Sequence, residues 1–128
     1  MQKMLVWGLW GLVIALVLIN CTKDSSTEDY LANADCSSID AANNTYTKNI
    51  KSILDARCAT SGCHDAFAQS ENIDLSTYGT AKTAFQNEDC LCSIHHGSGC
   101  KPMPDGGSKL SDALIQQIDC WAKSGYPQ

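Results

Sequence analysis

The sequence predicts a small all-α domain of about three helices with one long loop, preceded by a signal peptide and a flexible tether. Apolar residues recur at helical spacing in the middle of the chain and again near its end. No stretch shows the strict apolar–polar alternation that is typical of a half-buried strand. The segment "NEDCLCSIHHGSGCKPMPDGGSK", rich in Gly, Pro, Cys and His, predicts the long loop.

Residues 1–20 are expected to be a lipoprotein signal peptide. Lys3 precedes an apolar run from Met4 to Ile19. This run of about 16 residues is short for a bilayer-spanning helix, which needs about 20. The residues "LINC" resemble a lipobox, which implies lipidation of Cys21, although Asn20 stands where a small residue is usual. Simple secretion and an uncleaved anchor are the alternatives.

Residues 21–44 are expected to form a flexible acidic tether, because they are small and polar with almost nothing to bury. Residues 45–128 then form the domain. A domain of this size buries a modest core and usually needs disulfides, a metal or a cofactor for stability.

Charge and cysteine content restrict the function classes. The formal net charge is −5, and removal of the first 20 residues leaves 8 basic against 14 acidic residues. Without a basic patch, nucleic acid is an improbable partner. Eight cysteines in an exported chain indicate an oxidising compartment in which thiols are bonded.

The first predicted helix lies in "NTYTKNIKSILDARC", and Asn44 or Thr45 could cap it. Its apolar face consists of Tyr46, Ile50, Ile53, Leu54 and Cys58. The second, shorter helix covers Thr77 to Phe85, with Ser76 as its N-cap. Its inward side chains are Tyr78, Ala81 and Phe85.

The third predicted helix is the clearest. Ser111 is a good N-cap, Leu110 and Ile115 have hydrophobic-staple spacing, and Gly125 follows the last turn. Its buried stripe consists of Leu114, Ile118, Trp121 and Ala122.

The motif that most strongly indicates a functional site is "CATSGCH", which contains Cys58, Cys63 and His64. Its spacing is two residues longer than the C-x-x-C-H signature of covalent haem attachment. Gly62 and its polar neighbours suit an irregular turn that could take up the extra length. The motif alone leaves open a haem site, half of a metal site, or two disulfide cysteines beside an unrelated histidine.

The chain resembles class I cytochrome c over about residues 48 to 126. "IKSILDARCATSGCH" looks like the first helix and attachment loop, and "KPMPDGGSKLSDALIQQIDCWAKSG" looks like the methionine loop and closing helix. The resemblance implies one covalent haem c on Cys58 and Cys63, with His64 and Met103 as the axial iron ligands. It also implies an electron carrier rather than an enzyme, with redox partner proteins.

Met103 is favoured over His95 and His96 as the sixth ligand. Pro102 and Pro104 restrict the backbone around Met103 and hold it extended, whereas flexible glycines follow the two histidines. A bis-histidine site remains the alternative.

The other cysteines are expected to be structural. Cys90 and Cys92 diverge in an extended loop, so each should seek a different partner. Two bridges are expected among Cys90, Cys92, Cys100 and Cys120, with the pairing open and Cys36 left over.

Three other interpretations remain. A zinc site could use Cys90, Cys92, His95 and His96. A disulfide-stapled surface lipoprotein without haem could act as a binding module. The domain could also be the haem subunit of a larger membrane-associated oxidoreductase complex. In each case the protein is exported and held by its lipid on a membrane, facing the periplasm or the cell surface.

Overall fold

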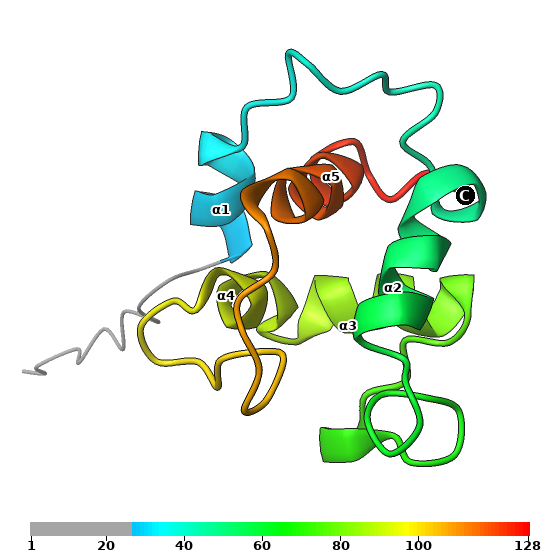
Figure 1. The fold of residues 1–128 in the computed structure, drawn as a ribbon. Coiled ribbons are helices and arrows are strands. Elements are labelled where there is room, and N and C mark those ends of the chain that lie inside the picture. Colours follow the sequence, from blue (N-terminus) through cyan, green and yellow to red (C-terminus); the bar gives the residue numbers. More distant parts are fainter. Residues whose placement is uncertain (1–26) are drawn as a thin grey trace, which may run out of the picture.

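The computed structural model describes residues 27–128, and within them the fold is entirely helical, as the sequence predicts. Five α-helices and two short helical turns surround one core, with α5 in the middle of the arrangement (Figure 1). They are α1 (Thr27–Asn33), η1 (Tyr46–Ile50), α2 (Lys51–Arg57), η2 (Ser70–Asn72), α3 (Tyr78–Asn87), α4 (Cys90–His95) and α5 (Asp112–Lys123).

The first predicted helix is present as the π-helical turn η1 followed directly by α2. Tyr46, Ile50, Ile53 and Leu54 are all buried, as the helical spacing predicts. Thr45 occupies the N-cap position, but its side chain makes no capping hydrogen bond. The helix ends at Arg57, so the first cysteine of the motif follows immediately at the C-cap.

Helix α3 matches the second predicted helix except at its cap. The N-cap is Thr77, whose Oγ1 accepts the N–H of Thr80 at 3.3 Å. Ser76, the expected cap, is engaged with the residue two positions before it: its N–H and hydroxyl both donate to Asp74 Oδ1, at 2.8 and 2.6 Å. Ser76 and Thr77 could each cap the helix. Because Asp74 accepts the N–H and the hydroxyl of Ser76, Thr77 occupies the cap position.

Helix α5 carries the centre of the core. Trp121 is fully buried and contacts the rings of Tyr46, Phe85 and Tyr126 at centroid distances of 6.2, 5.8 and 5.0 Å. Its indole N–H donates to the carbonyl of Pro127 at 2.9 Å, which folds the C-terminus back onto the helix. This tryptophan is therefore a core residue whose polar atom is satisfied.

Helix α4 lies where the sequence predicts an irregular loop. It has only six residues, of which Cys90, Leu91, Cys92 and Ile94 are buried. Such a short run is below the length at which helical periodicity becomes distinct. The helix ends at His95, and its C-cap residue His96 has a φ of 56°, in the left-handed region.

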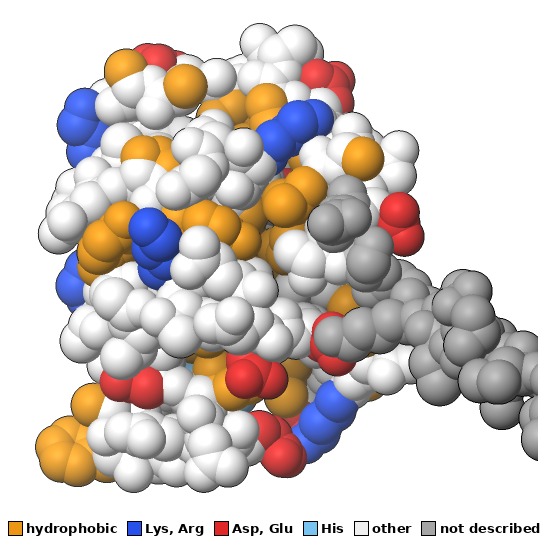
Figure 2. Space-filling view, turned by 180° about the vertical axis from the view of Figure 1, so that it is seen from behind, with side chains coloured by type: hydrophobic (Ala, Val, Ile, Leu, Met, Phe, Trp, Pro, Cys, Tyr) orange, Lys and Arg blue, Asp and Glu red, His pale blue; other side chains and the backbone are white. Residues whose placement is uncertain are grey.

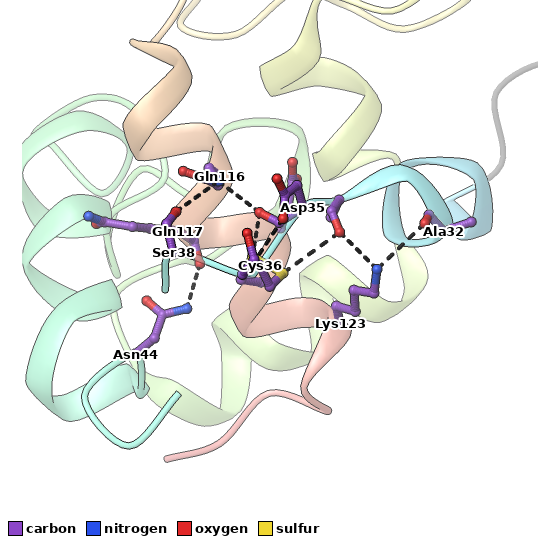
Figure 3. The surroundings of a disulfide bond; sticks show 12 residues. Ala32, Asp35, Cys36, Ser38, Asn44, Gln116, Gln117 and Lys123 are labelled. Atoms are coloured by element: carbon purple, nitrogen blue, oxygen red, sulfur yellow. Dashed lines mark hydrogen bonds between the residues drawn. A yellow bond between two sulfur atoms is a disulfide. The ribbon is translucent and has the colours of Figure 1, made fainter. Parts of the chain in front are cut away.

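Residues 27–44 differ from the predicted tether, because they pack against the domain. Lys123 Nζ donates to the carbonyl of Ala34 at 2.8 Å, and Gln116 Nε2 donates to the carbonyl of Asp35 at 2.7 Å (Figure 3). The Nδ2 of Asn44, a residue only 4% exposed, donates to the carbonyl of Gln117 at 2.9 Å. Backbone carbonyls make most of these contacts, so the side-chain pattern does not reveal them. We call residues 27–44 the N-terminal segment.

The disulfides also correct the predicted pairing. Cys92 bonds Cys100 as one of the expected combinations, but Cys120 bonds Cys36 (Figure 3). Cys90, expected in a bridge, is a buried free thiol. Because Cys90 and Cys92 lie on a helix rather than in an extended loop, their geometry differs from the one assumed for the pairing. The separation of 84 residues makes Cys36–Cys120 the larger of the two covalent loops.

The two disulfides indicate an extracytoplasmic protein. Among residues 27–128, no helix is long and apolar enough to cross a membrane. The expected signal peptide and the expected lipidation site, Cys21, lie outside the described residues. On the face in Figure 2, Lys and Arg side chains are dispersed among polar and acidic ones, and hydrophobic side chains form a band between them.

We expect the double substitution Cys36→Ser, Cys120→Ser to lower the free energy of unfolding by about 2–5 kcal/mol, the usual effect of removing a disulfide that closes a long loop. Urea unfolding without reductant measures the loss. The pair Cys92→Ser, Cys100→Ser is the matched control and should cost less, because its loop spans only 8 residues. A chain beginning at Asn43 should be destabilised at least as much as the first variant. Unchanged stability of that shorter chain would restore the tether interpretation.

Candidate functional site

The motif cysteines and His64 lie in the loop of residues 58–76, which we call the His64 loop. Cys58 ends α2, and its carbonyl accepts the N–H of His64 at 3.1 Å. The N–H of Cys63 donates to the carbonyl of Thr60 at 2.9 Å. Between them Gly62 has a φ of +82°, which only glycine adopts readily. The two extra residues are thus accommodated in a closed turn, which brings the backbone N–H of His64 within hydrogen-bonding distance of the Cys58 carbonyl.

One ring nitrogen of His64 is engaged in a hydrogen bond with the backbone. It is 9% exposed, and its Nδ1 lies 3.2 Å from the carbonyl oxygen of Ile73. A carbonyl only accepts, so Nδ1 carries a proton, and in the neutral imidazole Nε2 is then the nitrogen with the lone pair. Histidines that bind metals usually donate their other ring N–H to such a carbonyl, which fixes the tautomer and orients the ring. His64 therefore has the geometry of a preorganised ligand.

The thiols of the motif differ in environment. Cys63 is exposed, whereas burial raises the pKa of the Cys58 thiol to about 11. Neither is in a disulfide, although four other cysteines of the described chain are bridged. The third free thiol, Cys90, is buried, and burial raises its pKa to about 12. The motif thus retains two available sulfur atoms beside the histidine.

Asp65 organises the turn after His64, a role that the sequence analysis did not assign to it. Its carboxylate accepts the N–H groups of Phe67 and Ala68 at 2.8 and 2.6 Å and that of Gly62 at 3.2 Å. These hydrogen bonds hold the pKa of Asp65 below its ordinary value. An aspartate at the start of a turn commonly accepts backbone N–H groups of the following residues, and this pattern could have predicted the role of Asp65.

Met103 lies in a second loop, residues 96–111, which we call the Met103 loop. Met103 is partly buried, and its N–H donates to the carbonyl of Ser93 at 3.0 Å. The Cys92–Cys100 disulfide closes the start of the same loop against α4. Pro102 and Pro104 flank the methionine in the sequence, and the Met103–Pro104 peptide is cis.

The two loops meet through Lys101. Its Nζ lies 3.8 Å from Glu71 Oε1 in the His64 loop and 2.9 Å from Asp105 Oδ2 in its own loop. All three side chains are about half exposed or more, so this contact adds little stability. It does place the segment that carries Met103 beside the segment that follows His64.

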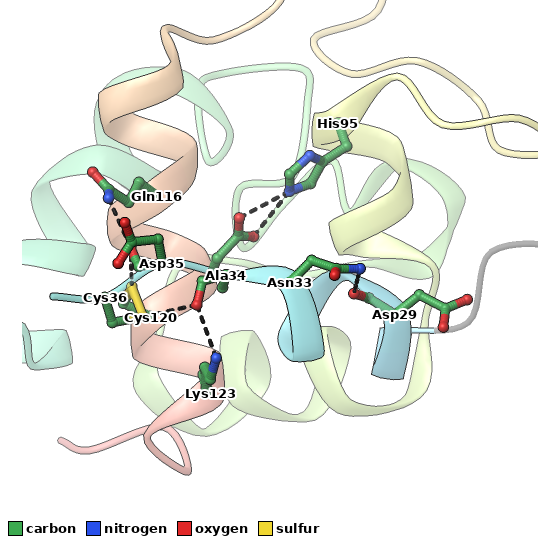
Figure 4. A network of polar contacts seen from close by, with 10 residues as sticks. Asp29, Asn33, Ala34, Asp35, Cys36, His95, Gln116, Cys120 and Lys123 are labelled. Atoms are coloured by element: carbon green, nitrogen blue, oxygen red, sulfur yellow. Dashed lines mark hydrogen bonds and ion pairs between the residues drawn. A yellow bond between two sulfur atoms is a disulfide. The ribbon is translucent and has the colours of Figure 1, made fainter.

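His95, which the sequence leaves open as a sixth ligand, is engaged elsewhere. Its Nε2 donates to both oxygens of Asp119, at 2.9 and 3.1 Å (Figure 4). Its ring stacks on Tyr30 with 4.5 Å between centroids. Burial raises the pKa of Asp119, and the hydrogen bond from His95 opposes that rise. The pair borders a cavity of about 340 Å³ between α1, α4 and α5. His95 therefore connects helices instead of facing the His64 loop.

His96 and the expected zinc ligands are also held in other contacts. His96 donates from Nε2 to the carbonyl of Met103 at 3.0 Å. Of the expected zinc ligands, Cys92 is in a disulfide and His95 is paired with Asp119. Within residues 27–128 no three His, Cys, Asp or Glu side chains are grouped so as to hold a metal ion. Both histidines considered for the sixth position thus have one ring nitrogen engaged in a polar contact within the fold.

Comparison of the chain with protein-family models, with curated proteins and with solved structures found no match.

We expect the haem-free chain to react with iodoacetamide at Cys63 first. At pH 8 the raised pKa values of Cys58 and Cys90 leave little thiolate, and burial restricts access, so both should react far more slowly. Peptide mapping by mass spectrometry measures the order. Addition of urea should equalise the three rates and serves as the control. Equal labelling of Cys58 and Cys63 in the folded chain would contradict the partly buried position of Cys58.

Proposed function

We propose that the protein is a monohaem c-type cytochrome on an exported, lipid-anchored chain and that it acts in electron transfer. One observation carries the proposal. His64 is oriented through Nδ1 by the carbonyl of Ile73, and its immediate neighbour Cys63 and the nearby Cys58 both keep unbridged sulfur atoms. In an oxidising compartment, two thiols beside an oriented histidine are the donor set that covalent haem attachment requires.

The residues present fit a haem c. Cys58 and Cys63 would provide the two thioether sulfurs, His64 Nε2 the proximal nitrogen, and Met103 the distal sulfur. When bound, haem supplies a one-electron Fe(III)/Fe(II) couple. A thioether opposite an imidazole favours the ferrous state and raises the reduction potential.

The chain's own groups determine how such a site would work. The Ile73 carbonyl fixes the tautomer and the plane of the His64 ring, and the hydrogen bond from the His64 backbone N–H to the Cys58 carbonyl fixes its backbone. Asp65 keeps the following turn in place. Cys63 is exposed, so a group bonded to it can be approached from solvent by a partner protein. No proton transfer is required of any of these residues.

A second candidate is a haem-free binding module held together by disulfides. The Cys36–Cys120 and Cys92–Cys100 bridges support this function equally well. It gives no role to the oriented His64 or to the two unbridged thiols beside it. A haem subunit of a larger membrane-associated complex uses the same site as the free carrier, and co-purification with a partner would distinguish the two.

We expect the mature protein, produced with a c-type maturation system, to show the reduced pyridine–haem spectrum of a thioether-linked haem. Cys63→Ala should abolish correct attachment, because Cys63 positions His64. Cys58→Ala should reduce attachment less, since one thioether would remain. Cys90→Ala is the matched control and should leave the spectrum unchanged. Wild-type protein without a c-type spectrum would overturn the proposed function in favour of the binding module.

We expect Met103→Ala to erase the weak far-red charge-transfer band of sulfur–iron ligation in the ferric protein and to lower the reduction potential. His95→Gln should keep the band, because His95 is bonded to Asp119. Absorption spectroscopy and redox titration measure both effects. A wild-type spectrum without the band, and loss of the low-spin spectrum only when a histidine is removed, would assign the sixth position to histidine.

A further inference from the structure

The end of helix α4 holds the backbone of Met103 on both sides. The carbonyl of Ser93 accepts the Met103 N–H at 3.0 Å, and His96 Nε2 lies 3.0 Å from the Met103 carbonyl oxygen. Because a carbonyl only accepts, His96 carries its proton on Nε2 and donates it. The two peptide groups that flank the Met103 side chain are thus both bonded to one short piece of α4.

His96 reaches this position because of how α4 ends. Its φ of 56° and ψ of 40° are in the left-handed region, which turns the chain out of the helix and directs it back along the Met103 loop. A non-glycine residue in this region is uncommon and carries a conformational cost. A hydrogen bond from its ring to Met103 offsets part of that cost.

The end of α4 is itself fixed from the opposite side. Tyr30 of α1 stacks on His95 and lies so close to Gly97 that a Cβ there would overlap its hydroxyl. The Gly97 N–H donates to the Cys92 carbonyl at 2.9 Å, and Cys92 is bonded to Cys100. The support under His96 therefore includes a ring stack, a close backbone approach and a covalent bond.

We propose that His96 is a positioning residue for Met103: it holds the methionine backbone so that the thioether is presented to the iron, and it is not itself a ligand. The inference rests on the proposed haem site. A thioether is a weak ligand, so a loop ordered in advance gives up less conformational entropy when the sulfur binds. Loss of the hydrogen bond should shorten the time that sulfur stays bound without removing the sulfur.

The test compares His96→Leu with His96→Gln in the full mature chain. Gln has an amide that can donate to the same carbonyl, whereas Leu has no donor. Ser108→Ala, an exposed position in the same loop, is the matched control. Two measurements are made on each protein: amide hydrogen exchange at Met103 in the haem-free chain, and the temperature at which the far-red sulfur–iron band disappears in the ferric haem-loaded chain.

We expect His96→Leu to speed exchange at Met103 several-fold and to lower the temperature at which the band disappears, because one hydrogen bond of ordinary strength is lost. In His96→Gln, the exchange rate at Met103 and the temperature at which the band disappears should stay close to their wild-type values. Ser108→Ala should change neither quantity. Exchange at the buried Trp121 amide should stay as slow as in wild type, which separates loop loosening from loss of the fold.

Four results would overturn the inference. Wild-type exchange and band stability in His96→Leu would show that the contact does not hold Met103. Equal losses in His96→Leu and His96→Gln would show that ring packing, not the hydrogen bond, is responsible. Disappearance of the low-spin ferric spectrum in His96→Leu, with no far-red band in wild type, would make His96 a ligand. A wild-type chain that takes up no haem would overturn the proposed function as well, whereas the first two results would leave that function intact.

Discussion

Three consecutive residues of helix α5 hold the described part of the molecule together. Trp121 is buried against rings from η1, α3 and the C-terminal segment. Cys120 is bonded to Cys36 of the N-terminal segment, and Asp119 accepts two hydrogen bonds from His95 of α4. Because successive helical residues point in different directions, one turn of α5 can reach three separate parts of the chain. The remaining elements depend on this turn for their relative positions.

The His64 loop and the Met103 loop each place one leucine in the core, Leu75 and Leu110, and are otherwise ordered by local hydrogen bonds. The His64 loop is bonded to itself through the Cys58 carbonyl, the Ile73 carbonyl and the Asp65 carboxylate. The Met103 loop is bonded to the end of α4 and is closed by a disulfide. Such loops need a rigid scaffold more than an apolar face of their own. A small domain could in this way present the proposed ligand residues without burying all of them.

Sequence periodicity predicted the all-α class, the apolar faces of α2, α3 and α5, and the central position of Trp121. It missed α4, because six residues give too short a pattern, and it missed the packing of residues 27–44. That segment is fixed by contacts of its backbone carbonyls, by Cys36, and by the side chains of Tyr30 and Leu31, which are too few to produce a hydrophobic pattern. Disulfide pairing depends on which distant residues meet, so spacing along the chain could not choose Cys36 for Cys120.

Prediction of the candidate site from the sequence is limited in the same way, at the level of single hydrogen bonds. The motif residues could be identified from their types and spacing, since Cys58, Cys63 and His64 are neighbours in sequence. The groups that orient them could not, because a backbone carbonyl such as that of Ile73 is available in any residue and only the fold brings it to His64. The contacts of the two adjacent histidines could not be predicted either. Their positions in the sequence do not reveal that His96 bonds the Met103 carbonyl whereas His95 bonds Asp119.

The most direct measurement is the mass of the tryptic peptide that spans residues 58–82, isolated under denaturing conditions from mature protein made with a c-type maturation system. Cleavage after Arg57 and Lys82 separates Cys58, Cys63 and His64 from every other cysteine. We expect this peptide alone to retain one haem, bound through both cysteines. A peptide of unmodified mass, or one in which Cys58 and Cys63 are joined to each other by a disulfide, would contradict the proposed haem site.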